Sequence, residues 1–453
     1  MAVGKQLLSV GLDVGTTSTQ MILSKLTAEN RASSFAVPKM EITEREILYR
    51  SPVYFTPLSS ETLVDGVALR RLIEKEYASA GITPADVDTG AVIITGETSR
   101  KENAETVLKE LSDFAGDFVV ATAGPDLESI LAARGAGAVE RSEGNRVLHM
   151  DIGGGTSNLC LVEDGKILAT GCLNVGGRLL KLDKSGRITY RSPVLEGITS
   201  LQVGDMPTTH QLVELAQTLT AALEMAAGLQ EETDILCKLM TKETGKPWRI
   251  PTGVLPSFSG GVADCIATDY PDLAFGDLGP VLGRAIRRSN LCAGKYFLGT
   301  ETIRATVIGA GCHSVALSGS TVFFQNITFP LKNIPAAVAE NPNSAQDVAN
   351  ALGTLDTEGF LAIPGYSSPS YAQVKDLAQV IAQGFGNRPV RVVVEADMAK
   401  ALGHCLRLLL PKDTPCLCMD GLCLELGSYL DVGEPVGPAL PVVIKTVILG
   451  GNQ

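Results

Sequence analysis

The stretch Val147–Leu161, VLHMDIGGGTSNLCL, decides the fold of this chain. An apolar strand runs into Asp151, three glycines and a threonine, and a second apolar strand follows. Glycines are needed in such a turn because a phosphate must come within hydrogen-bond reach of backbone N–H groups, which a Cβ would obstruct. The stretch therefore predicts a β-hairpin whose turn can bind a phosphate group beside a carboxylate.

The same pattern occurs earlier in the chain, in Leu8–Ser24, LSVGLDVGTTSTQMILS. Asp13 ends the apolar strand there, and 138 residues separate it from Asp151. Each half of the chain thus contributes a strand, a phosphate-sized turn beside an aspartate, and a returning strand. Two such hairpins facing each other would hold a polyphosphate from both sides, with a divalent cation between the two carboxylates. We therefore expect a nucleotide clamp that binds ATP and Mg²⁺.

Both turns would supply phosphate ligands through backbone N–H and hydroxyl groups. The expected ligands are Gly15, Thr16, Thr17 and Ser18 from the first turn, and Gly153, Gly154, Gly155 and Thr156 from the second. Asp13 and Asp151 would anchor Mg²⁺ through water, since Mg²⁺ sheds its hydration shell reluctantly. The alternative is two ordinary hairpin turns, each capped by a strand-end aspartate, and the duplicated context favours the clamp.

Length and composition describe a large globular protein. The 453 residues correspond to roughly three domains of ~150 residues. The hydrophobic fraction of 45% is enough for a large core. The net charge of −12 argues against nucleic-acid binding, which uses a basic face. No apolar run approaches the ~18–20 residues that span a bilayer, and the N-terminus leads directly into the first strand without a signal peptide. We therefore expect a cytoplasmic protein that binds neither nucleic acid nor membrane.

Ten cysteines are present, and several stand in apolar runs where a reduced thiol behaves as a small hydrophobe. Cys416, Cys418 and Cys423 have C-x-C-x₄-C spacing, but no matching fourth ligand lies nearby in the sequence. We expect buried thiols here rather than a metal site.

The hairpin pattern also divides the chain into domains. Residues 1–146 and 147–319 each begin with a hairpin and continue with helices and further strands, whereas residues 320–453 do not repeat the pattern. The prediction is an α/β protein with two duplicated halves and an additional C-terminal α/β domain. Within the second half, we expect a helix over Thr209–Leu229 and a loop over Ser185–Pro207.

Three motifs resemble those of the actin, Hsp70 and sugar-kinase ATPase superfamily. Asp13-Val-Gly-Thr-Thr-Ser-Thr resembles its first phosphate motif, Asp151-Ile-Gly-Gly-Gly-Thr its second, and Ser259-Gly-Gly-Val its adenosine motif. The resemblance implies two actin-like (ribonuclease H-like) domains. It also implies that Gly260 and Gly261 approach the adenosine or ribose.

A closer resemblance spans nearly the whole chain. The segments QLLSVGLDVGTTSTQ, SPVYFTP, TGETSR, DFVVATAGPDLESILAARGAGA, LNVGGRLL, RATVIGAGCHSVALSGST and PVVIKTV resemble the ethanolamine ammonia-lyase reactivating factors (EutA family). The lyase is an adenosylcobalamin radical enzyme of ethanolamine catabolism that inactivates when its cofactor loses the adenosyl group. The resemblance implies a molecular chaperone that uses ATP to release the damaged cobalamin, with the lyase as partner. It also implies a cytoplasmic location, inside or beside the ethanolamine-utilisation microcompartment.

The resemblance further suggests catalytic roles. Asp13, Asp151 and Glu128 are the expected catalytic residues, and Glu128 would orient the attacking water. The alternative for Glu128 is a first-turn glutamate that complements a helix N-terminus. Glu97 is a weaker candidate for the same role. Gly176 and Gly177 resemble a further glycine pair near the ligand. Many superfamily members have an acid directly after that pair, whereas this chain has Arg178, which would pair with phosphate instead.

Two other functions fit the same fold. A small-molecule kinase would need a catalytic aspartate over an acceptor hydroxyl, and neither Asp126 nor Asp205 is placed to make that case. An actin-like assembly protein would need polymer contacts that sequence does not reveal, and a homo-oligomer stays open. His149 and His313 stand within apolar elements and are expected to be core residues or to support the site from behind.

Overall fold

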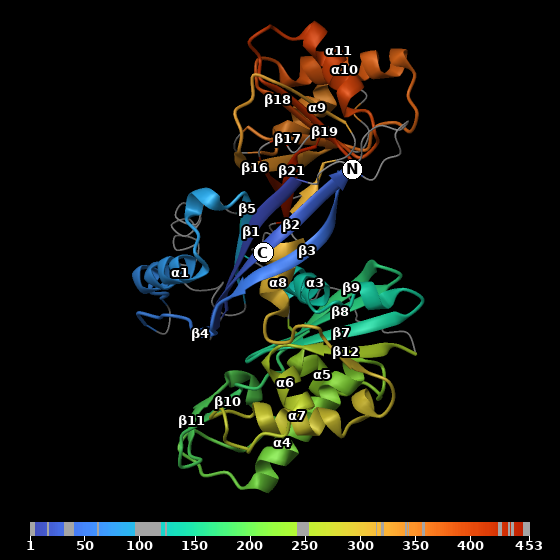
Figure 1. Cartoon of the computed structure of the whole chain (residues 1–453). Coiled ribbons are helices and arrows are strands. Elements are labelled where there is room, and N and C mark those ends of the chain that lie inside the picture. The colour runs from blue at the N-terminus through green and yellow to red at the C-terminus, as the bar shows by residue number, and fades with distance from the viewer. Residues whose placement is uncertain are drawn as a thin grey trace.

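The computed structural model describes residues 5–15, 18–30, 40–60, 63–95, 119–122, 125–241, 253–313, 315–318, 321–339, 342, 344–355, 358–424, 428–433, 435 and 439–446. Three large sheets form three successive regions, which we call lobe I, lobe II and the C-terminal domain (Figure 1). Lobe I lies between the other two in this view.

Lobe I is built on a sheet in the order β3-β2-β1-β5-β6. Its strands are β1 (Lys5–Val14), β2 (Ser18–Asn30), β3 (Met40–Arg50), β5 (Thr89–Ile94) and β6 (Val119–Thr122), with the short β4 (Tyr54–Phe55) paired to β2. The first three strands form an antiparallel meander, and β5 and β6 run parallel to β1. Helix α1 (Gly66–Ala80) packs on one face, and the carboxylate of Asp65 caps its N-terminus.

Lobe II repeats this sheet. Its order is β9-β8-β7-β12-β13, made of β7 (Arg146–Ile152), β8 (Ser157–Glu163), β9 (Lys166–Leu173), β12 (Leu255–Ser259) and β13 (Phe297–Leu298). Again three antiparallel strands are followed by two strands parallel to the first. Because strand order and direction match those of lobe I, the prediction of duplicated actin-like α/β domains is confirmed.

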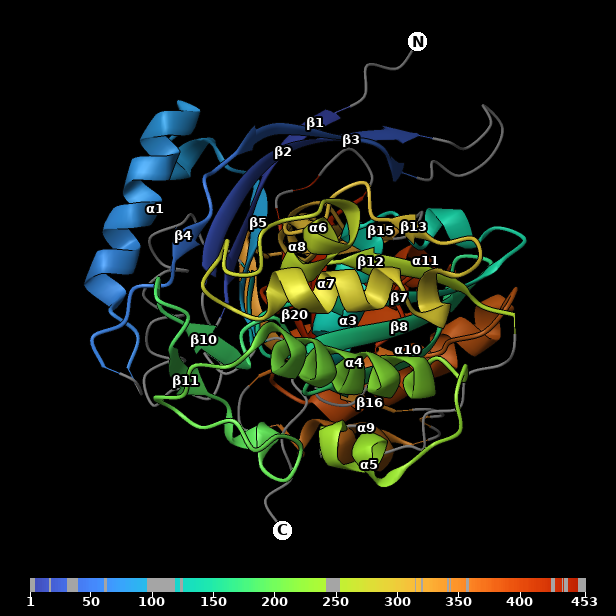
Figure 2. The ribbon, with the colours of Figure 1, turned by 90° about the horizontal axis from the view of Figure 1, so that it is seen from below.

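The rest of lobe II covers this sheet (Figure 2) and extends beyond it. The additional elements are β10 (Leu180–Leu182), β11 (Ile188–Arg191), α4 (Thr209–Ala226), α5 (Asp234–Leu239), α6 (Gly261–Ala267) and α7 (Gly279–Arg287). The helix predicted over Thr209–Leu229 is confirmed as α4, which begins at a Thr208–Gln211 capping box. The loop predicted over Ser185–Pro207 is wrong in part, because β11 pairs there with β10 in a small separate sheet.

Two helices are exchanged between the lobes. Helix α3 (Pro125–Gly135) follows the lobe I sheet in sequence but packs on β7, β8 and β9 of lobe II. Helix α8 (Ala305–His313) follows the lobe II sheet but packs on β1, β2 and β5 of lobe I. The two helices cross in backbone contact: a Cβ added to Gly135 would lie 1.9 Å from the carbonyl oxygen of Ala305, and one on Gly309 would lie 2.0 Å from that of Leu131. The small residues of both helices therefore allow their backbones to approach this closely.

The C-terminal domain has an eight-stranded sheet in the order β14-β21-β20-β16-β17-β18-β19-β15. Its strands are β14 (Val315–Leu317), β15 (Val322–Gln325), β16 (Leu331–Val338), β17 (Phe360–Ile363), β18 (Val390–Val394), β19 (Cys416–Asp420), β20 (Ser428–Val432) and β21 (Pro441–Thr446). Strands β16 to β19 are parallel neighbours in chain order, joined by α9 (Ala345–Leu352), α10 (Tyr371–Phe385) and α11 (Ala399–Leu409). Since right-handed crossovers in one direction place all connections on one face, the three helices share one side of the sheet (Figure 1).

Helix α8 leads into β14, so the polypeptide passes from the lobe crossing into the C-terminal sheet within a few residues. In addition, β14 lies near β3 and β21 lies near β6, so the C-terminal domain adjoins the sheet of lobe I. Cys416 and Cys418 are buried in β19 as expected, whereas Cys423 is exposed and the expectation of a buried thiol there is wrong. No helix in the described part of the chain is long and apolar enough to cross a membrane.

Candidate functional site

The first predicted phosphate turn, Gly15–Ser18, joins β1 to β2 and is called phosphate loop 1. The amide of Gly15 donates to the carbonyl oxygen of Ser18 at 2.9 Å, and this bond closes the turn. The hydroxyl of Thr56 donates to the carbonyl oxygen of Gly15 at 2.7 Å from the segment after β4. Thr16 and Thr17 lie outside the described residues, so their contribution stays a prediction.

The second turn, Gly153–Thr156, joins β7 to β8 and is called phosphate loop 2. It closes with the equivalent bond, from the amide of Gly153 to the carbonyl oxygen of Thr156 at 2.9 Å. A Cβ added to Gly155 would meet no atom within 4 Å, so this glycine faces open space. The two loops therefore close with the same hydrogen bond, and the second leaves its backbone open at Gly155.

Asp151 ends β7 and is 7% exposed. Its carboxylate accepts a hydrogen bond from the hydroxyl of Ser259 at the end of β12, and a second from the hydroxyl of Thr306 in α8 at 3.3 Å. Thr306 thus connects the helix that packs on lobe I to the carboxylate of lobe II. Burial raises the pKa of Asp151, and these two hydroxyls oppose the increase.

His149 supports this carboxylate from behind. Its Nε2 lies 2.9 Å from the Ser259 hydroxyl and its Nδ1 lies 2.9 Å from the Ser257 hydroxyl. Because the single proton of Ser259 points to Asp151, Nε2 donates to Ser259, and in a neutral imidazole Nδ1 then accepts from Ser257. This assignment requires a neutral imidazole, and complete burial lowers the pKa of His149 to about 3. The expectation that His149 supports the site from the core agrees with this arrangement.

Asp13 occupies the corresponding position in lobe I, at 8% exposure. The hydroxyl of Thr95, which directly follows β5, donates to its Oδ1 at 3.0 Å. Burial raises the pKa of Asp13 to about 7 against the lowering effect of Thr95, and the charge of Asp151 raises it further. The two aspartates are therefore close enough to repel each other, and each is held by a hydroxyl at the end of the neighbouring parallel strand.

Two buried carboxylates that repel each other form a suitable place for a divalent cation. In the described part of the chain, neither makes an ion pair with a lysine or arginine. The same residues contain no cluster of three or more metal-ligating side chains. Mg²⁺ is usually held by one or two carboxylates together with water and phosphate oxygens rather than by an all-protein cage. The donor set thus fits Mg²⁺ in the presence of a polyphosphate.

The predicted glycine pairs lie directly behind phosphate loop 2. The amide of Gly177 donates to the carbonyl oxygen of Gly153 at 3.0 Å. A Cβ added to Gly176 would lie 2.3 Å from the carbonyl oxygen of Gly154. Gly260 has a positive φ of 82°, and a Cβ there would lie 2.3 Å from the carbonyl oxygen of Ile152. Close packing against the loop therefore explains why Gly176 and Gly260 are glycines. Gly261 begins α6 and is not crowded in this way.

Glu128 lies in the first turn of α3 and is half-buried. The start of this helix is fixed on β9, because Thr170 donates to Asp126 at 2.5 Å and Ser129 donates to the carbonyl oxygen of Gly171 at 3.3 Å. Asp126 thus has a structural role in the described contacts. Glu97, the weaker candidate for orienting water, lies outside the described residues.

Sequence reasoning missed three hydroxyl residues that hold the carboxylates: Thr95, Thr306 and the side chain of Ser259. Ser259 was singled out only for its motif. Two of them could have been found from their place in the sheets. Thr95 and Ser259 come at the ends of β5 and β12, which lie parallel to β1 and β7. Nothing in the sequence around Thr306 indicates its contact with a residue 155 positions earlier.

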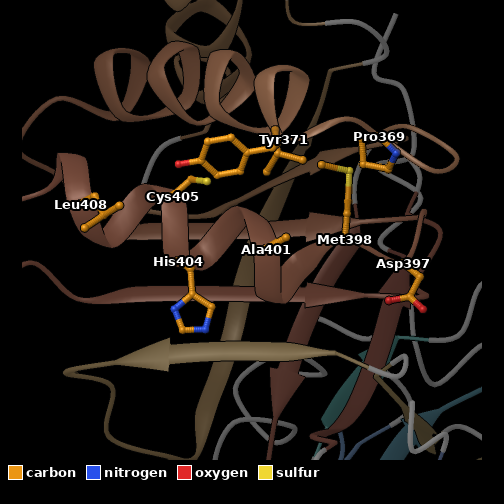
Figure 3. Close-up of a pocket in the computed structure, with 9 residues that line it drawn as sticks. Pro369, Tyr371, Asp397, Met398, Ala401, His404, Cys405 and Leu408 are labelled. Atoms are coloured by element: carbon orange, nitrogen blue, oxygen red, sulfur yellow. The ribbon is translucent and has the colours of Figure 1, made fainter. Parts of the chain in front are cut away.

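The C-terminal domain carries a separate groove of about 490 Å³ between α10 and α11 (Figure 3). Its walls are mainly apolar and include Tyr371, Met398, Ala401, Cys405 and Leu408. Tyr371 is 70% exposed and Leu408 is 74% exposed, which is unusual for large apolar side chains on one surface.

Comparison with known proteins places the chain in a family. The family described as ethanolamine utilisation protein EutA matches residues 5–450. The ethanolamine ammonia-lyase reactivases EutA of Salmonella typhimurium and Escherichia coli are each 39% identical to this chain over 465 aligned positions, which cover 98% of both proteins.

Solved structures that resemble it include a Ppx/GppA protein from Aquifex aeolicus, 12% identical with a TM-score of 0.42, covering 67% of this chain and 97% of that one. Another is the ethanolamine utilization protein EutJ from Carboxydothermus hydrogenoformans, 17% identical with a TM-score of 0.33, covering 67% and 89%. TM-scores this low establish no shared fold by themselves, whereas the family match spans almost the entire sequence. The chain belongs to the EutA family of ethanolamine utilisation proteins.

Proposed function

We propose that this protein is an ATP-dependent reactivating factor for ethanolamine ammonia-lyase. It releases damaged cobalamin from the lyase so that adenosylcobalamin can rebind. The observation that carries the proposal is the 39% identity, over 98% of both chains, to two proteins named as reactivases of this lyase. The twin phosphate loops and their paired aspartates support the ATP-dependent part of the proposal.

The nucleotide lies between the lobes in this proposal. Backbone N–H groups of both phosphate loops donate to the phosphates, and Gly261 at the start of α6 marks the adenosine side. Asp13 and Asp151 would hold Mg²⁺, which when bound would neutralise charge on the terminal phosphates and favour attack at phosphorus. The hydroxyls of Thr95, Ser259 and Thr306 donate to the two carboxylates and hold them in place, which supports this role.

Glu128 is the proposed water-orienting residue. It projects from the first turn of α3, a helix whose start is fixed on β9 by two hydrogen bonds. Such a group contributes typically 10²–10⁴-fold in rate when it is well placed for acid–base work. The glycines behind phosphate loop 2, Gly176 and Gly260, contribute by setting the loop's backbone position.

Closure of the lobes would transmit the nucleotide state to the partner. A ligand shifts a conformational equilibrium only through different affinities for the two states, and ATP that touches both loops favours the closed state. Helices α3 and α8 cross in close contact at Gly135 and Gly309. A change in the angle between the lobes would therefore move these two helices relative to each other. Because α8 leads into β14, this change would be delivered to the C-terminal domain.

We assign the lyase contact to the C-terminal domain, and within it to the groove between α10 and α11. Lys400, His404 and Arg407 stand on the exposed side of α11, which contains no acidic residue, although the chain as a whole carries a charge of −12. Lys375 on α10 lies close enough to Cys405 to lower its thiol pKa, against the stronger effect of burial. The groove is lined by apolar side chains together with Asp397 and His404. It therefore fits a segment of the lyase that presents mainly apolar side chains. The protein would then act where the lyase resides, which we propose is the ethanolamine-utilisation microcompartment.

The direct test is reactivation of lyase that has been blocked with cyanocobalamin. Blocked lyase, free adenosylcobalamin and Mg²⁺ are mixed with this protein and either ATP or no nucleotide. The expected result is recovery of ethanolamine deamination and release of cyanocobalamin only when ATP is present. Absence of recovery with ATP, from protein that is folded and binds ATP, would contradict the assigned client.

A further inference from the structure

Arg178 connects phosphate loop 2 to strand β4, which pairs with the end of phosphate loop 1. Its amide donates to the carbonyl oxygen of Gly154 at 2.6 Å, which fixes its backbone on phosphate loop 2. Its side-chain stem also lies on this loop, because a Cβ added to Gly154 would be 3.3 Å from the Cδ of Arg178. The guanidinium therefore extends from the base of the loop toward the other lobe.

On the side of lobe I, the guanidinium meets Phe55. Its Cζ lies 5.9 Å from the centre of the Phe55 ring, within the range of a cation–π contact. Phe55 is 80% exposed, so it does not belong to the core of lobe I. It is tied to phosphate loop 1 instead: Phe55 pairs with Ser18, and the next residue, Thr56, donates to the carbonyl oxygen of Gly15.

One partner orients the guanidinium and leaves most of its donors available. Arg178 Nε donates to Oδ2 of Asp277 at 3.2 Å, and Oδ1 of Asp277 accepts from the amide of Gly279 at 2.9 Å. Within the described part of the chain, the terminal nitrogens of Arg178 make no hydrogen bond, and its side chain is 31% exposed. Asp277 is 9% exposed and acts as a fixed support.

A polyphosphate is the ligand class that fits this arrangement. A guanidinium presents planar, paired donors that match phosphate oxygens, and it stays charged at any working pH. The two loops otherwise offer neutral amides and hydroxyls, and Asp13 and Asp151 offer negative charge. Arg178 thus supplies a fixed positive charge at the edge of phosphate loop 2.

We infer that Arg178 binds the polyphosphate of the nucleotide and, through Phe55, joins phosphate loop 1 to phosphate loop 2 in the nucleotide-bound state. The inference rests on the proposed binding of ATP. Arg178 would thus take part in phosphate recognition and lobe closure. If it served only as the ion-pair partner of Asp277, it would do neither.

Calorimetric titration of the full chain with Mg²⁺ and either ATP or AMP tests the role in phosphate recognition. Arg178→Gln is the informative variant, because its side-chain amide can still donate to Asp277 while the positive charge and the paired N–H donors of the guanidinium are lost. We expect its affinity for ATP to fall about tenfold or more and its affinity for AMP to fall less than about threefold. Arg178→Lys should give an intermediate loss, since it keeps the charge without the paired donors. Arg187→Ala, which removes an exposed arginine of the β10–β11 hairpin, is the matched control and should bind as wild type does.

Hydrogen exchange tests the connection between the loops. ATP should slow exchange of the amides around Phe55 in wild type, and this protection should be lost in both Arg178→Gln and Phe55→Ala. An unchanged ratio of ATP to AMP affinity in Arg178→Gln, with wild-type protection around Phe55, would overturn the inference and leave the proposed function intact. Failure of folded wild type to bind ATP would overturn both.

Discussion

The charge of Asp151 raises the pKa of Asp13, although 138 residues separate the two in the chain. Each aspartate lies near the end of the first strand of its sheet, and each is held by a hydroxyl at the end of the adjacent parallel strand, Thr95 for Asp13 and Ser259 for Asp151. The repeated sheet thus contributes two buried carboxylates, one of which acts electrostatically on the other. A cation between them would remove the repulsion that raises the pKa.

Binding of Mg²⁺ and ATP should therefore release a proton from Asp13. With a pKa of about 7 in the unliganded protein, this carboxyl is largely protonated at about pH 6, and a metal ligand must be ionised. We expect the observed binding enthalpy at about pH 6 to vary with the ionisation enthalpy of the buffer, and this variation to vanish toward about pH 8.5. Asp13→Asn should show no such dependence, and equal enthalpies in all buffers for wild type at the lower pH would contradict the expectation.

His149 should make the protein sensitive to mild acid. Its pKa is about 3 in the folded state, whereas an exposed histidine has an ordinary pKa of 6.5. Below pH 6.5 the unfolded chain therefore binds a proton that the folded chain does not. Stability contributed by neutral His149 is fully present above that pH and declines as the pH falls toward 3, by roughly 1 kcal/mol per pH unit. Wild type should be more stable than His149→Gln at neutral pH, and the difference should shrink on acidification.

Denaturant unfolding of both proteins at several pH values measures this effect, since other titrating groups are common to both. A stability difference that stays constant between neutral pH and about pH 5 would show that His149 does not resist protonation.

The crossing of α3 and α8 should make Gly309 intolerant of a methyl group. In an ordinary helix, Gly→Ala stabilises by up to ~1 kcal/mol, but a Cβ here would lie 2.0 Å from the carbonyl oxygen of Leu131. We expect Gly309→Ala to lose about 1–3 kcal/mol through forced separation of the helices, seen as a lower midpoint of thermal unfolding. Gly294→Ala is the control, because a Cβ at Gly294 meets nothing within 4 Å. A midpoint for Gly309→Ala at or above that of wild type would refute the close crossing.

A charge in the groove of the C-terminal domain should separate partner binding from nucleotide binding. Leu408→Asp places a carboxylate on a 74% exposed groove residue and should fold normally. It should bind ATP like wild type but lose about tenfold or more in reactivation of blocked lyase at limiting concentration, because docking of an apolar segment would remove the new carboxylate from water. Leu409→Asp, on the neighbouring position outside the groove lining, should retain activity. Equal activity of the two variants would place the lyase contact elsewhere.

Local signals in the sequence were sufficient for the two hairpins and for the duplication. A strand, an aspartate and a glycine turn are adjacent residues, so Asp13 and Asp151 could be located without knowledge of the sheets. The partners Thr95, Ser259 and Thr306 could not, because their contacts depend on strand register and on a helix exchanged between lobes. Small residues in the segments of α3 and α8 indicated close packing but did not say which helix would lie against which.

Other elements were harder to predict for reasons of composition. The β10–β11 hairpin is short and surrounded by polar turn residues, so the stretch Ser185–Pro207 resembled a loop. Strands β17 and β20 are short, and most of their residues are buried, so they lack the alternation that marks a half-exposed strand. In the structure Gly176 packs closely on the backbone of phosphate loop 2, and its predicted contact with the ligand stays a prediction.

A double-mutant cycle on ATP affinity tests most directly whether the two loops form one Mg²⁺–ATP site. Calorimetry would compare wild type, Asp13→Asn, Asp151→Asn and the double variant, each with Mg²⁺ and with a chelator. If both carboxylates serve one metal, each single change should weaken Mg²⁺-dependent ATP binding about tenfold or more, and the double change should cost clearly less than the sum of the two. Wild-type affinity in either single variant, or strictly additive losses, would contradict a shared site between the lobes.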